Sequence, residues 1–257
     1  MIAGKSFCSS GVAALCATVV ALALGQTALD ASDFTSTDSM LCAASASPQV
    51  TAAPALDDLL ARMDGRAKDI KTVEADITIT NEETFSGHKT DRSGKLYVKK
   101  PDTLLLDLVK PWPRRIWISS REIVDYRPDF KTGDRVILAD DSGERPQVIG
   151  LSTTSDELRR DFHITLAPPG EKPAAYLLTL VPKESVSVDF TSAEVTIDAA
   201  TLLPTTIIQK NAALDEVKTY ALSEVKVNPR LSDRLFEPDL PKGADVEEHK
   251  VGDWKGP

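Results

Sequence analysis

The stretch SGKLYVKKPDTLLLDLVKPWP, residues 93–113, decides the fold class. Apolar residues recur at every second position on both sides of a proline in this stretch. Positions two apart carry one apolar set, which comprises Leu96, Val98, Leu104, Leu106 and Leu108. Alternation of this kind is typical of β-strands with one apolar face. The aligned set must therefore either pack into a core or contact an apolar ligand.

The same alternation recurs along most of the chain, with turn residues between the segments. We predict strands at residues 72–80, 94–98, 103–109, 115–119, 122–126, 135–138, 176–181, 187–190, 193–198, 205–210 and 217–227. Short strands at this spacing favour an antiparallel meander, here in one domain over residues 54–248. About eleven strands must curl, since a flat sheet would leave long exposed edges. The sheet is therefore predicted to have a concave face.

Two segments are candidates for a lid over that concave face. The segment PALDDLLARMDG, residues 54–65, predicts a short helix that ends before Gly65, and its apolar stripe comprises Leu56, Leu59, Leu60 and Met63. Residues 148–162 begin with the apolar Val148 and Ile149 and contain a helical turn from Ser155. Ordinary core packing of the helix stripe is the alternative to a lid.

The first part of the chain does not resemble a folded domain. Residues 1–25 combine Lys5 with an uncharged run shorter than the roughly 20 residues of a membrane span, which predicts a cleaved signal peptide. Cleavage is expected after residue 25, or as late as residue 46. Residues 26–53, rich in Ala, Ser, Asp and Thr, are interpreted as a disordered linker, and residues 249–257 as a tail.

The cysteines agree with export as an unlipidated protein. Cys8 and Cys16 lie in the predicted leader, so Cys42 alone would remain and no disulfide could form within one mature chain. Cys16 and Cys42 each follow a leucine rather than the small residues that precede a lipidated cysteine. We therefore expect a soluble protein in the periplasm.

Composition and motifs argue against nucleic-acid binding and offer no catalytic site. With 30 Lys and Arg against 39 Asp and Glu, the formal net charge is −9, which disfavours nucleic acid as a partner. His88, His163 and His249 are scattered and have no metal-ligand spacing. We predict no catalytic residues, no metal and no cofactor. An enzyme remains an alternative, because carboxylates from distant strands leave no motif.

Several segments, in order, resemble the LolA family of periplasmic lipoprotein carriers: GKLYVKKP at 94–101, DYRPDFKTGDRV at 125–136, and YALSEVKVNPRLSDRLFEPDLPKGADV at 220–246. The resemblance implies a mainly β fold, an unclosed antiparallel barrel with a short helical lid. It also implies binding rather than catalysis, with the apolar set and Trp117 lining a cavity for acyl chains of lipoproteins. The implied partners are an inner-membrane lipoprotein-releasing transporter and an outer-membrane acceptor, and the carrier is expected to be a monomer.

The chain departs from the family pattern at the end of its first motif. Where the resemblance implies Lys-Arg-Pro with an inward arginine that hydrogen-bonds the lid, this chain has Lys100, and Leu104 replaces an aromatic residue. Lysine lacks the planar fork of arginine. We therefore expect Lys100 to gate a lid that opens more easily, or a different cargo. A periplasmic protein of the same fold that senses lipid or lipoprotein is the alternative function.

Overall fold

The structure is a computed structural model that describes residues 53–138, 153–168, 174–184, 190–211 and 215–250, with residues 186 and 188. The predicted signal peptide, nearly all of the linker, Val148, Ile149 and residues 251–257 lie outside the described residues. The described elements are α2 (Ala53–Asp69), β1 (Thr72–Glu83), β2 (His88–Lys99), β3 (Thr103–Lys110), β4 (Arg114–Ile118), β5 (Glu122–Arg127), β6 (Thr132–Ile137), α3 (Ser155–Asp161), β7 (Phe162–Leu166), β8 (Ala175–Pro182), β9 (Ser192–Asp198), β10 (Pro204–Asn211), β11 (Glu216–Val227), the 3-10 helix η1 (Asp233–Phe236) and β12 (Asp245–Lys250).

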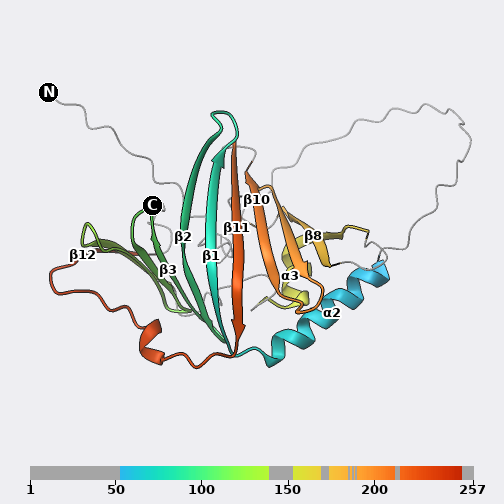
Figure 1. Cartoon of the computed structure of the whole chain (residues 1–257), viewed down its shortest axis with the longest axis horizontal. Coiled ribbons are helices and arrows are strands. Elements are labelled where there is room, and N and C mark those ends of the chain that lie inside the picture. Colours follow the sequence, from blue (N-terminus) through green and yellow to red (C-terminus); the bar gives the residue numbers. More distant parts are fainter. Residues whose placement is uncertain are drawn as a thin grey trace, which may run out of the picture.

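The described strands form one curled sheet that does not close (Figure 1). Its order is β12-β6-β5-β4-β3-β2-β1-β11-β10-β9-β8-β7, so β12 and β7 are the two edges. Neighbouring strands pair antiparallel except β12 and β6, which pair parallel. The prediction of a mainly β, unclosed half-barrel is confirmed.

The strand register places the apolar set of the opening stretch on one face. Leu96 pairs with Leu106 and Val98 with Leu104, and Val98 also pairs with Val73 of β1. Since paired residues in a ladder point to the same side, the set extends from strand to strand along the concave face. It belongs to one buried cluster, which also includes Ile77, Ile79, Ile116, Ile118, Ile123, Val136 and Tyr220.

Helix α2 packs on the other half of the same concave face. Its stripe residues Leu59, Leu60 and Met63 are buried among the side chains of α3 and β7–β9, and Leu56 packs against the edge of this second cluster. Ile207 of β10 lies in contact with both clusters. Figure 1 shows α2 running beside β8 and α3. The helix therefore covers the β7–β10 half of the sheet, away from β2 and β3.

The convex face carries a third, smaller cluster, and this corrects one predicted site residue. The prediction that Trp117 lines the concave cavity is wrong, because Ile116 and Ile118 point to the concave side and Trp117 packs with Leu105 on the opposite side. The indole Nε1 of Trp117 donates a hydrogen bond to the carbonyl oxygen of Leu235 at 3.1 Å. Trp117 therefore holds the segment around η1 against the back of the sheet.

Some predicted boundaries also differ from the structure. Helix α2 continues past Gly65 to Asp69, because Met63 and Ile70 are buried on either side of an exposed glycine. Strand β7 was not predicted, and β12 extends into the predicted tail as far as Lys250. The described residues of the predicted strand 187–190 are not in a strand.

Candidate functional site

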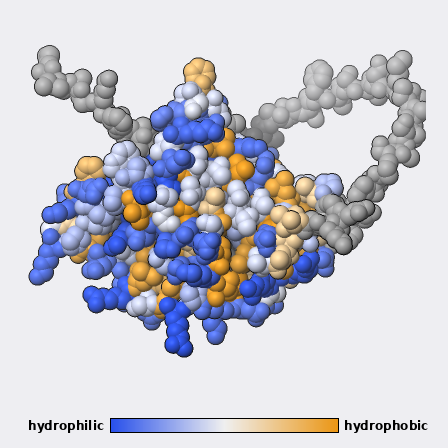
Figure 2. Space-filling view, in the orientation of Figure 1, coloured by the Kyte–Doolittle hydropathy of each residue, from blue (hydrophilic) through white to orange (hydrophobic). Residues whose placement is uncertain are grey.

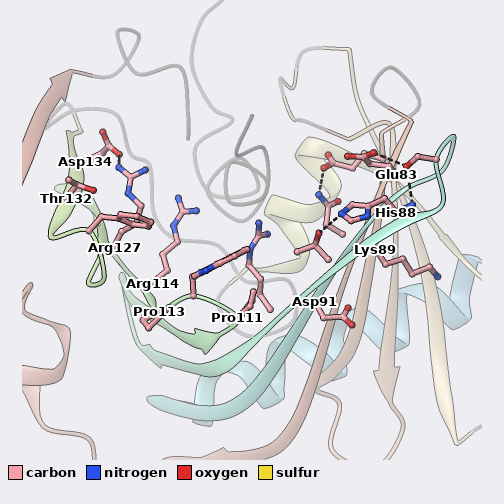
Figure 3. Close-up of a pocket in the computed structure, with 18 of the residues that line it drawn as sticks. Glu83, His88, Lys89, Asp91, Pro111, Pro113, Arg114, Arg127, Thr132 and Asp134 are labelled. Atoms are coloured by element: carbon pink, nitrogen blue, oxygen red, sulfur yellow. Dashed lines mark hydrogen bonds and ion pairs between the residues drawn. The ribbon is translucent and has the colours of Figure 1, made fainter. Parts of the chain in front are cut away.

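A cavity of about 1620 Å³ opens at the end of the half-barrel where the β1–β2, β3–β4 and β5–β6 hairpins turn. This volume exceeds the roughly 300–1,000 Å³ of pockets that bind drug-sized ligands. Figure 3 shows Glu83 and His88 on one wall and Arg127, Thr132 and Asp134 on the opposite wall, with Arg114 between them.

The concave face changes from apolar to polar toward this opening. Along β1 the concave side carries Ile77 and Ile79 and then Asn81 and Glu83, because the side-chain period of two continues through the strand. On β2 the corresponding partner of Ile79 is Arg92. The concave face is therefore polar where it lines the open cavity and apolar farther along the strands.

Charges at the mouth are held mainly by fixed ion pairs. Arg114 and Asp125 are both buried and form a bidentate pair, with Nε to Oδ1 at 2.7 Å. Arg127 Nη2 donates to Asp134 Oδ2 at 2.9 Å. Burial and the neighbouring Arg114 lower the pKa of Arg92, whose Nη1 is buried without a hydrogen-bond partner. Bidentate and buried pairs of this kind fix side-chain positions more than they add net stability.

The residues described contain one group whose ligand atoms lie close enough for a metal ion. Asp134, Glu247 and His249 place their atoms within 4.8 Å of one another. However, Asp134 already accepts from Arg127, and His249 Nε2 lies 3.1 Å from its other oxygen. Ion pairing accounts for this arrangement.

The predicted cavity residues lie deeper than the open cavity. Leu96, Val98, Leu104, Leu106 and Leu108 are each buried on the concave face, and none of them lines the opening. They share the face with the cavity, and Leu96, Val98 and Leu104 lie toward the opposite end of the strands, whereas Leu108 is nearer the mouth. Contact between this set and a ligand therefore stays a prediction.

Helix α2 is held to its surroundings by polar contacts along its length. Asp64 accepts a hydrogen bond from the backbone N–H of Ser155 at 2.9 Å, at the start of α3. Arg159 forms an ion pair with Asp57, and Arg62 donates to the hydroxyl of Tyr176 at 3.3 Å. These contacts, together with the buried stripe, would have to break for α2 to leave the sheet.

Lys100 reaches the C-terminal end of this helix. Its Nζ donates to the carbonyl oxygen of Ala67 at 2.7 Å, and burial lowers the pKa of the ammonium group. A cation is favoured at this end because the last helical carbonyls are unpaired and carry the negative pole of the helix dipole. A gating role for Lys100 stays a prediction.

Sequence reasoning missed a second contact at the same point. Asn228 accepts from the N–H of Lys71 at 2.7 Å through Oδ1 and donates to the carbonyl of Asp69 at 2.9 Å through Nδ2. Its φ of 56° is left-handed, a region that asparagine tolerates better than most residues. The dipeptide Asn228-Pro229 is a turn signal that would have drawn attention to this position.

The fold is an unclosed half-barrel whose concave face carries two adjoining apolar clusters, one of them covered by a helix, with an open cavity lined mainly by polar side chains at one end. Among the described helices, none is both long and apolar enough to span a membrane.

Comparison with known proteins identifies the family. The profile of "Outer membrane lipoprotein carrier protein LolA" matches residues 68–239, and the chain therefore belongs to the LolA family, which is a carrier family rather than an enzyme family.

An outer-membrane lipoprotein carrier protein from Coxiella burnetii is 26% identical over 169 residues, which are 65% of this chain and 77% of that protein. The corresponding protein from Alkalilimnicola ehrlichii is 23% identical over 158 residues, 62% of this chain and 69% of that protein. A solved LolA superfamily protein from Nitrosomonas europaea aligns with a TM-score of 0.38 and 14% identity, covering 70% of this chain and 98% of that chain.

Proposed function

We propose that this protein is a periplasmic carrier that binds the acyl chains of lipid-modified proteins and moves them from the inner to the outer membrane. The observation that carries the proposal is the apolar concave face of a half-barrel within a chain of the LolA family. The partners on this proposal are an inner-membrane transporter that releases lipoproteins and an outer-membrane acceptor. The chain would reach them as an exported, unlipidated protein.

The polar mouth and the apolar concave face beyond it suit a ligand with a polar head and an apolar tail. The protein part of a lipoprotein would stay outside the opening, and its acyl chains would extend past Arg92 toward Leu106 and Leu108. A longer chain would reach the second cluster only if α2 moved, because Leu59, Leu60 and Met63 cover that half. The helix is therefore proposed as the lid.

The energetics favour a gated carrier. An acyl chain of about sixteen carbons transferred out of water is worth about 12 kcal/mol at roughly 0.8 kcal/mol per methylene. Binding of that strength without opposition would be close to irreversible. Opening of α2, which breaks the contacts of Asp64, Asp57 and Lys100, would offset part of it and keep release possible.

The test is release of a lipoprotein from inner-membrane vesicles that contain the lipoprotein-releasing transporter. The vesicles are mixed with the purified protein, and the soluble fraction is analysed by mass spectrometry for a complex that contains acylated lipoprotein. The matched control is the same cargo with its lipidated cysteine replaced by serine, which should not be captured. A complex that also passes its cargo to outer membranes supports the carrier. Absence of any acylated complex would overturn the proposal, and binding without transfer would instead fit a lipoprotein-sensing protein.

A second experiment asks whether the lid must move. The variant Asp64→Cys/Ser155→Cys, with Cys42→Ser, would join α2 to α3 through two side chains that are already hydrogen-bonded, since the Ser155 hydroxyl donates to Asp64 Oδ2. We expect the oxidised form to bind fluorescent palmitate more weakly than the reduced form of the same variant. Equal binding of the two forms would show that α2 stays closed when an acyl chain binds.

A further inference from the structure

The hairpin tips around the cavity mouth carry the most exposed apolar side chains among the described residues. Phe85 at the β1–β2 turn is 93% exposed, Trp112 at the β3–β4 turn 64% and Phe130 at the β5–β6 turn 70%. All three line the same opening. In an antiparallel meander every second turn lies at the same end of the sheet, which explains how residues spread over 46 positions gather there. Figure 2 shows an isolated hydrophobic group at the top of the molecule, where Figure 1 has the β1–β2 hairpin.

Backbone contacts or prolines order the turn that carries each aromatic residue. In the first turn, Thr84 N–H donates to the carbonyl of Asp215 at 2.7 Å and Gly87, at a φ of 67°, closes the hairpin. Trp112 stands between two prolines. In the third turn, Phe130 N–H donates to the carbonyl of Arg127 at 3.2 Å. The three exposed rings are therefore carried by turns with an ordered backbone.

Each tip also presents one exposed lysine. Lys89, Lys110 and Lys131 stand beside Phe85, Trp112 and Phe130 respectively, in a chain whose net charge is −9. Lys89 shares an exposed ion pair with Glu82 at 2.9 Å. Aromatic and basic residues are enriched in protein surfaces that contact the headgroup region of a bilayer.

We infer that these three tips dock the mouth of the half-barrel on a phospholipid bilayer surface. A protein partner would need a contiguous apolar patch, whereas these rings are separated by a mouth that is lined mainly by polar and charged side chains, with more carboxylates than cations. A bilayer interface accepts separate anchors, and the ammonium groups of Lys89, Lys110 and Lys131 are the side chains at the tips that would contact anionic headgroups. The inference deepens the proposed function and rests on it for its purpose, since docking would place the cavity opening directly over acyl chains.

The experiment is flotation of the whole processed chain with vesicles of phosphatidylethanolamine and a minority of phosphatidylglycerol. We expect the parent protein to float. Each of Phe85→Ser, Trp112→Ser and Phe130→Ser should weaken partitioning about tenfold, because partial burial of one ring is worth roughly that factor. The matched control, Leu177→Ser/Val181→Ser on β8, removes exposed apolar side chains that are not part of the mouth and should float like the parent.

Lipids brominated near the headgroup provide a readout of depth. They should quench the fluorescence of Trp112, and Trp112→Phe should retain flotation while losing that quenching. Replacing the three lysines with glutamine should weaken binding to the anionic vesicles by roughly fivefold per lysine. Circular dichroism would verify that all variants stay folded.

The outcomes distinguish the docking inference from the proposed carrier function. A parent protein that does not float, or a triple aromatic variant that floats like the parent, overturns the docking inference. Binding only to vesicles that contain membrane proteins also overturns it and assigns the tips to a protein partner. A protein that captures acylated lipoprotein without floating loses the docking inference alone, and one that floats without capturing lipoprotein loses the proposed function alone.

Discussion

Replacing Lys100 with methionine tests whether one hydrogen bond helps to hold the lid closed. Methionine keeps the apolar stem but removes the donor whose Nζ lies 2.7 Å from the carbonyl oxygen of Ala67. A hydrogen bond from a charged donor is worth about 1.5–3 kcal/mol. The Ala67 carbonyl also accepts from the N–H of Ile70 at 3.2 Å, so the substitution leaves no orphaned acceptor. We therefore take the lower end of that range, about 1.5 kcal/mol, which corresponds to about a tenfold increase in the opening equilibrium of α2.

Hydrogen–deuterium exchange of the α2 amides reports on that equilibrium, because a helix of 17 residues that leaves the sheet is only marginally stable in water and frays. The matched control is Lys68→Met, which removes the same charge from an exposed position one residue after Ala67, where the described residues provide no hydrogen bond or ion pair to it. We expect clearly faster exchange throughout α2 for Lys100→Met and at most a small change for Lys68→Met, whose exposed charge interacts only with the helix dipole. Equal exchange rates in the two variants and the parent would refute a holding role for Lys100.

The same residue gives a pH dependence with a defined sign. Burial lowers the pKa of Lys100 in the folded state below its ordinary value, so within the window between the two pKa values the unfolded chain binds more protons. Stability then rises with pH across that window and levels off above the ordinary lysine pKa. The difference in unfolding free energy between the parent and Lys100→Met should therefore grow as pH rises through this alkaline range. A difference that stays constant or shrinks there would contradict the assignment.

Three further substitutions test the packing around the site by urea denaturation. Gly94→Ala would place a Cβ 2.0 Å from the carbonyl oxygen of Asp107 and should lower the unfolding free energy by about 3 kcal/mol. Gly65→Ala meets no atom within 4 Å and should raise it by about 1 kcal/mol, because alanine is the better helix former. Arg114→Met would leave the carboxylate of Asp125 buried without its partner at a cost of about 3–5 kcal/mol, and adding Asp125→Leu should recover most of the loss.

Features encoded by neighbouring residues were predictable. The period-two pattern located β1, β3, β5, β9 and β10 closely, and it placed Leu96, Val98, Leu104, Leu106 and Leu108 on one face. The helical spacing of Leu59, Leu60 and Met63 identified the buried stripe of α2. Such patterns are local because side-chain direction depends only on the repeat of the backbone.

Features that depend on distant contacts were not predictable. In RRIWI, residues 114–118, three consecutive apolar residues do not show which side chains point to the concave face. The pairing of Trp117 with Leu105 and the hydrogen bond from Trp117 to the carbonyl of Leu235 place Trp117 on the convex face. Strand β12 consists mainly of charged residues, since a parallel edge strand pairs through its backbone and needs no apolar face. Its pairing with β6 therefore leaves no pattern in the sequence.

The sequence by itself determined that the chain forms a curled, mainly β sheet with one apolar face and that Lys100 follows one of its strands. Tertiary structure decided that α2 continues past Gly65, that Asn228 and Lys100 meet at the end of that helix, and that the three aromatic tips surround one opening. The reason is physical: backbone periodicity is set by adjacent residues, whereas the residues that meet at a helix end or a cavity mouth are brought together only by strand pairings across the whole sheet.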